Sequence, residues 1–243
     1  MEFFIPVSCF RILKSLGFGL GFLFCAPAFR LDDEGTRAMD IALTLSVVAV
    51  AWLALSMRYQ RAHIALLGRH LASLQLERHM ETLTQGYIRA IHDEGETRQI
   101  QVLETFAQTE CAAAAQAQSL AQAMQMESAQ ATSMGTLPFC IPYVERFFPK
   151  ATRDFRELLH IHAAGLRHVV DNKGRWDAKN RAYHLSAELY LLQHSCHWFC
   201  KSRTVADARL KLRHQSNHQK VLESVSTVTR SAYLRWLQAT DER

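Results

Sequence analysis

The chain has 243 residues, of which 49% are hydrophobic and 21% charged, and its formal net charge is +5. Two stretches of 110 and 94 residues contain no proline, because all five prolines lie near the start or in the middle (Pro6, Pro27, Pro138, Pro142, Pro149). Strand-rich folds need turn residues roughly every 8–12 positions, and the apolar content is too high for a disordered chain. The composition therefore predicts an all-α protein.

The positive charge is concentrated in the last hundred residues. Residues 144–243 hold 18 basic and 10 acidic side chains, whereas 1–57 and 58–143 carry net charges of −1 and −2. A basic helical segment can bind an anionic lipid surface or an acidic protein. Because the sequence has no nucleic-acid recognition motif, we expect lipid or protein partners and no nucleic acid.

Residues 41–57 form an uncharged apolar run without a helix breaker. Seventeen residues at 1.5 Å each span about 25 Å, the short end of what crosses a bilayer. Arg58, Tyr59 and Arg61 follow directly and are typical of the membrane interface. The run predicts a transmembrane helix.

A second apolar run, 15–29, precedes the first along the chain. It follows Arg11 and Lys14 and contains Ala-Pro-Ala at 26–28, which also fits a signal-peptidase site. A cleaved signal peptide, a mitochondrial import segment and a retained membrane helix are all open. We favour the retained helix, in which Gly17 and Gly21 form a face for close helix packing.

The two runs together predict a transmembrane helical hairpin over residues 1–57. The positive-inside rule places Arg11, Lys14 and the arginines after residue 57 on one side, with the acidic residues 32–34 on the other. Most of the chain then lies on the matrix or cytoplasmic side of an inner membrane. Cysteines on that side (Cys111, Cys140, Cys196, Cys200) are expected to stay reduced.

Residues 58–135 carry apolar side chains at spacings of three and four, which predicts a long extended amphipathic helix. Glycines at positions 68, 86 and 95 disfavour the helix, and we expect a bend near 92–96. Residues 107–132 are mostly Ala and Gln, which offer a thin packing surface. We therefore expect this arm to lie along a partner, although a partly disordered linker is the alternative.

Three prolines in 136–149 predict a break, after which 150–243 forms a basic helical unit. Helical spacing predicts a helix over 150–170, a turn at 171–174 and a second helix from Trp176. That helix either continues or breaks near 201–204. A helical hairpin or a three-helix unit fits this pattern.

A histidine- and cysteine-rich stretch lies in this unit, and its best metal-ligand candidates are His194, Cys196, His197 and Cys200. Cysteine and histidine are ligands for soft metals. The spacing matches neither a haem-attachment motif nor a zinc knuckle, so core thiols and ordinary imidazoles are the preferred interpretation. Glu157 and His160 have the spacing of a di-iron ligand pair, but Glu188 lacks the matching histidine. No metal or other cofactor is expected.

No nucleophile elbow, phosphate-binding loop, dinucleotide fingerprint or zinc-protease motif occurs in the chain, so we expect no enzyme. The layout of membrane hairpin and long inside helix is similar to that of b-type peripheral-stalk subunits of ATP synthases. We expect a structural accessory subunit of an inner-membrane complex, in the respiratory chain or an ATP synthase, mitochondrial before bacterial. The alternatives are a metal- or haem-binding membrane protein and a bacterial bitopic envelope or secretion-complex protein.

Overall fold

The computed structural model describes residues 33–91 and 95–239, and most of them are helical, as predicted. Contacts divide the chain into two units, Met1–Tyr59 and Gln60–Arg243. The residues expected to form the arm (58–135) and those of the basic helical unit (150–243) therefore lie almost entirely in one unit. The first apolar run, 15–29, and its Gly17 and Gly21 lie outside the described residues.

Helix α2 (Asp33–Leu71) contains the second apolar run. From Met39 onward it is long and apolar enough to cross a membrane. Its large apolar side chains are mostly exposed, for example Leu43 at 66% and Val50 at 67%. The hydroxyls of Thr44 and Ser46 donate to the carbonyl oxygens four residues earlier, at 2.8 and 2.7 Å. These polar groups are thus satisfied within the helix, as a lipid environment requires.

The prediction of one long helix through residues 58–135 is wrong. Helix α2 ends at Leu71, and three separate helices follow: α3 (Leu76–Ile91), α4 (Glu96–Glu104) and α5 (Ala107–Gln125). Gly95 caps α4 with a φ of +94°, a conformation that no helix can contain and that glycine adopts without strain. This break coincides with the expected bend at 92–96.

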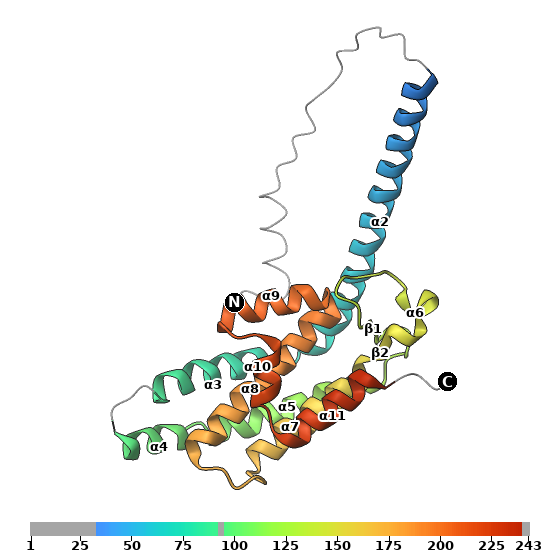
Figure 1. Ribbon diagram of the computed structural model, residues 1–243. Coiled ribbons are helices and arrows are strands. Elements are labelled where there is room, and N and C mark those ends of the chain that lie inside the picture. Colours follow the sequence, from blue (N-terminus) through green and yellow to red (C-terminus); the bar gives the residue numbers. More distant parts are fainter. Residues whose placement is uncertain (1–32, 92–94, 240–243) are drawn as a thin grey trace. The chain divides into compact units, whose positions relative to one another are not determined.

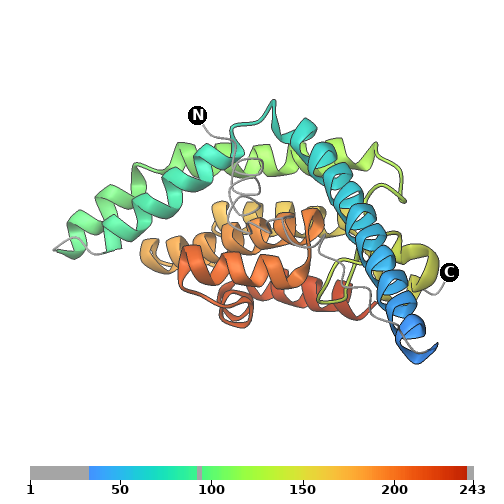
Figure 2. The same ribbon diagram turned by 90° about the horizontal axis from the view of Figure 1, so that it is seen from above.

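Helix α5 finds its packing partner within the same unit. It lies mainly against α7 and also against α3. Its buried face includes four alanines (Ala113, Ala114, Ala117, Ala121), whose small side chains allow the helices to approach closely. In Figure 2 the green helices run beside the orange ones. The thin packing surface of the Ala- and Gln-rich segment, which we expected to face a partner, is therefore buried within the same unit.

The proline-rich segment 136–149 lies between helices α5 and α7 in the sequence. Two short antiparallel strands flank it, β1 (Ser133–Gly135) and β2 (Thr152–Asp154), with Met134 opposite Arg153. Between them lie helix α6 (Val144–Phe147) and a 3-10 turn, Pro149–Ala151. Three-residue strands carry too little alternation to be recognised in the sequence.

Five helices complete the fold, rather than the expected two or three: α7 (Phe155–Val170), α8 (Ala178–Cys200), α9 (Arg203–His214), α10 (His218–Ser224) and α11 (Thr227–Gln238) (Figure 1). The predicted turn at 171–174 and the predicted break near 201–204 are present. Each helix begins after a residue whose side chain caps its first turn (Asp154, Asp177, Ser202, Asn217, Ser226).

A column of stacked rings lies in the core of the second unit. Phe155 of α7 stacks on Phe199 of α8 with ring centroids 4.1 Å apart, and His63 stacks on the other side of Phe199 at 4.4 Å. The His63 Nδ1–H donates to the Phe199 carbonyl oxygen at 2.9 Å. The last turns of α2, from Gln60 to Leu71, are thereby fixed to the helices that follow.

Candidate functional site

Helix α8 carries the predicted ligand candidates and is the most enclosed helix of its unit. Thirteen of its 23 residues are buried, and it contacts α7, α9 and α10. A helix with apolar side chains on every face is suited to such a central position. His194, Cys196, His197 and Cys200 all lie in its last two turns.

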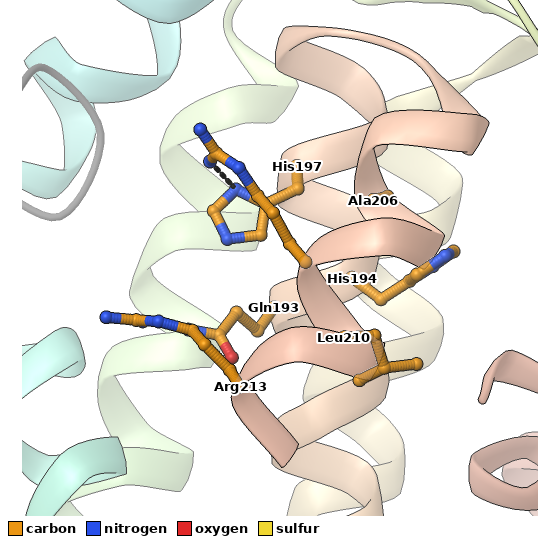
Figure 3. A pocket seen from close by; sticks show the side chains of 7 residues that line it. Gln193, His194, His197, Ala206, Leu210 and Arg213 are labelled. Atoms are coloured by element: carbon orange, nitrogen blue, oxygen red, sulfur yellow. Dashed lines mark hydrogen bonds between the residues drawn. The ribbon is translucent and has the colours of Figure 1, made fainter. Parts of the chain in front are cut away.

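These four side chains do not converge on a metal site. His194 Nε2–H donates to Asp207 Oδ1 of α9 at 2.8 Å, and His197 Nδ1 accepts a hydrogen bond from Arg209 Nη1 at 2.9 Å (Figure 3). Burial raises the pKa of the Cys196 thiol, and Cys200 is 2% exposed. Within residues 33–91 and 95–239, no three His, Cys, Asp or Glu side chains are placed to hold a metal ion.

The di-iron pattern is not assembled either. Glu157 and His160 are exposed on α7, whereas Glu188 is fully buried in α8. Glu188 Oε1 accepts a hydrogen bond from the Ser226 backbone N–H at 3.1 Å, and burial raises the pKa of this carboxyl to about 7. Glu188 therefore links α8 to the N-terminus of α11 through this hydrogen bond.

The structure does assemble four imidazoles into a cluster, which we call the histidine cluster: His162, His194, His197 and His218. His162 Nε2 lies 2.8 Å from Ser195 Oγ, and His218 Nε2 lies 3.0 Å from Tyr233 Oη. The rings of His194 and His218 are 4.7 Å apart. The cluster joins α7, α8 and α10 and contacts α9 and α11 through hydrogen bonds.

Three members of the histidine cluster are held in the uncharged form at neutral pH. Burial is the main cause, and it lowers the pKa of His162 and His197 to about 3 and that of His218 to about 4. Nearby cations act in the same direction on His197, first among them Arg209. The hydrogen bond from the Arg209 guanidinium requires an unprotonated Nδ1 on His197, so geometry and electrostatics agree.

A narrow depression beside the cluster is lined from α8 and α9 (Gln193, His194, His197, Ala206, Arg209, Leu210, Arg213) (Figure 3). It is too tight to admit the centre of a water molecule. A substrate pocket typically has several hundred Å3 of space. Of its lining side chains, His197 and Arg209 are hydrogen-bonded to each other, and the depression leaves no room for a small molecule.

A second buried polar network lies between α3, α5 and α8. Tyr87 Oη donates to the carboxylate of Glu110, which is 2% exposed, and Arg181 Nη2 lies 3.3 Å from Glu110 Oε2. Burial and the neighbouring carboxylate both raise the pKa of the Tyr87 hydroxyl. A buried carboxylate with two donors is satisfied, and it fixes the register of three helices.

Sequence reasoning selected the His160–His197 region but missed two parts of this arrangement. His218 joins the cluster only because α9 returns the chain to α8, and no local pattern indicates that return. Glu110 stands alone among alanines and glutamines, so only the folded chain reveals its partners.

Comparisons with known proteins assign no family to the chain. No protein-family model matches it, and neither a curated protein nor a solved structure shows significant similarity. The similarity in layout to peripheral-stalk subunits depended on one long helix after the membrane segment. Because α2 ends at Leu71, that feature is absent from the described residues.

Proposed function

We propose that the protein is a non-catalytic, membrane-anchored accessory subunit of a larger assembly. The single observation that carries this proposal is the uncovered apolar surface of α2, where residues such as Leu45, Val48 and Leu53 are 59–63% exposed. Exposed apolar area on this scale is costly in water and needs a lipid or protein cover. The length of an apolar helix of about 17 residues matches the thickness of a bilayer better than the length of a groove on a protein.

The interior of the second unit supports a structural role. Its buried ionisable side chains make internal hydrogen bonds: His194 to Asp207, Glu110 to Tyr87, and Glu188 to Ser226. Catalytic acids and bases are usually found in clefts that reach solvent. The depression beside His197 is too tight to admit a water molecule, which favours a unit that positions a partner over one that transforms a substrate.

The partner we propose is another subunit of the same membrane complex. The net charge of +8 on residues 144–243 suits an acidic protein surface or anionic lipid. Arginines after residue 57 favour the matrix or cytoplasmic side of an inner membrane, mitochondrial before bacterial. A respiratory-chain or ATP synthase complex is the specific assembly that we propose.

Affinity purification of the full chain in a mild detergent tests the proposal. We expect the chain to migrate with a fixed set of membrane proteins in a particle far larger than 27.7 kDa plus a micelle. We also expect low yield when it is expressed without them. A folded, monodisperse monomer obtained in good yield from cells that contain its natural partners would contradict an accessory role.

A further inference from the structure

The connection between β1 and β2 exposes an unusual number of aromatic side chains. We call residues 138–149 the aromatic loop. Phe139 is 66% exposed, Phe147 69%, Phe148 55% and Tyr143 37%. Single exposed apolar residues are common on soluble proteins, but four aromatic side chains within twelve residues indicate a binding surface.

The aromatic loop is fixed to its own unit, so this exposure does not result from a loose chain. The Thr204 backbone N–H and hydroxyl both donate to the Pro138 carbonyl oxygen, at 3.1 and 2.7 Å. Trp198 Nε1–H donates to the Gly135 carbonyl oxygen at 2.9 Å. In α6, Val144 is 2% exposed and Phe147 points to solvent, so one short helix has a packed face and a presented face.

The aromatic loop is attached to Gln60, a residue that follows the apolar run of α2 closely in the sequence. The Cys140 thiol is hydrogen-bonded to the Gln60 side chain, which also accepts a hydrogen bond from Lys201 Nζ at 2.9 Å. Gln60 follows Met57, the last residue of the apolar run, by three positions in the same helix.

Basic side chains accompany the aromatic ones. Arg146 and Lys150 are exposed, and the Arg146 guanidinium lies 5.4 Å from the centre of the Tyr143 ring. Aromatic rings are enriched where lipid headgroups meet the hydrocarbon. Neighbouring Lys and Arg side chains add attraction to lipid phosphates and to anionic lipids.

We propose that the aromatic loop is an interfacial membrane-binding element, in which Phe139 and Phe147 enter the headgroup region of the bilayer that α2 crosses. Arg146 and Lys150 bind the lipid phosphates beside them. The loop then gives the protein a second membrane contact. This inference rests on the proposed anchoring of α2 in a bilayer.

Photo-crosslinking in the full chain tests the inference. Phe147→p-benzoylphenylalanine keeps an aromatic side chain at an exposed site, and the protein is placed in nanodiscs of phosphatidylcholine and phosphatidylserine. The same substitution at Val48 reports on the apolar run, and at Leu212, 83% exposed in α9, on a surface site outside the loop. Mass spectrometry counts lipid adducts, and circular dichroism confirms that each variant is folded.

We expect lipid adducts at position 147 several-fold above those at 212, together with strong adducts at 48. Adducts at 48 with no excess at 147 would overturn the inference and leave the anchoring of α2 intact. The absence of lipid adducts at position 48 would overturn both this inference and the proposed anchoring of α2. Cross-links from 147 to a co-purified protein in place of lipid would identify a protein-docking surface and also overturn the inference.

The contribution of charge is tested in the same assay. Replacing both Arg146 and Lys150 by Gln should remove most of the increase in position-147 adducts that phosphatidylserine produces, and should leave the adducts at 48 unchanged. If the phosphatidylserine effect at 147 survives both substitutions, these cations do not bind the lipid.

Discussion

Lowering the pH from 7 to 5 should destabilise the second unit, because three buried histidines resist protonation. In the folded chain the pKa of His162 and His197 is about 3 and that of His218 about 4, against an ordinary value of 6.5. Below pH 6.5 the unfolded chain therefore binds more protons than the folded chain. The stability from these groups is present above pH 6.5 and is lost as the pH falls towards 3 or 4.

The size of the effect follows from the same pKa differences. Each of the three histidines loses about 2 kcal/mol of its contribution between pH 7 and pH 5, or about 6 kcal/mol together. Glu188 opposes them, because its folded pKa of about 7 favours proton uptake by the folded chain. That carboxyl offsets about 2 kcal/mol over the same interval, so the net loss from these four groups is about 4 kcal/mol.

Urea unfolding of the full chain in nanodiscs, followed by tryptophan fluorescence at pH 5 and pH 7, measures this loss. His162→Gln should reduce the difference between the two pH values by about 2 kcal/mol. His160→Gln, at an exposed site on the same helix, is the matched control and should leave it unchanged. An unfolding free energy that is equal at both pH values, or an identical response of the two variants, would refute the reasoning.

Three further predictions concern packing and thiol exposure. Gly165→Ala places a Cβ in a steric clash with the hydroxyl of Thr229 in α11 and should cost about 1–3 kcal/mol of unfolding free energy. In the same urea titration Gly68→Ala, whose Cβ meets no atom within 4 Å, should be neutral or stabilising. Arg181→Met leaves a buried carboxylate without its cation and should cost about 3–5 kcal/mol by that assay; an unchanged midpoint would show that the ion pair is dispensable. Maleimide labelling read by mass spectrometry should modify the exposed Cys111 within minutes and the buried Cys200 only in denaturant, and equal rates would contradict the packing of α8.

Local patterns were sufficient to predict the helical class, the apolar helix and the main breaks. The signals for these features are local in the sequence: an uncharged run of 17 residues, three clustered prolines and the turn at 171–174. The long arm was predicted incorrectly because its thin apolar face was assigned to an external partner. The folded chain covers that face itself, with α7 and α3 packed on α5.

The histidine cluster could be predicted only in part, for a related reason. The sequence shows a local enrichment of six histidines between His160 and His197. Such an enrichment does not predict which of the imidazoles come together in the fold. His160 is exposed, whereas His162, two residues later, is fully buried. His218 completes the cluster from a helix whose position depends on contacts far apart in the sequence.

Backbone hydrogen exchange across residues 41–57 of the unmodified chain in nanodiscs tests most directly whether α2 anchors the protein in a bilayer. A helix in hydrocarbon has no water at its peptide groups, so we expect these amides to remain protected for hours. An isolated helix of this length in water opens repeatedly, and its amides exchange far sooner. Complete exchange of 41–57 within seconds to minutes, while the core peptides of α8 stay protected, would contradict membrane anchoring by α2.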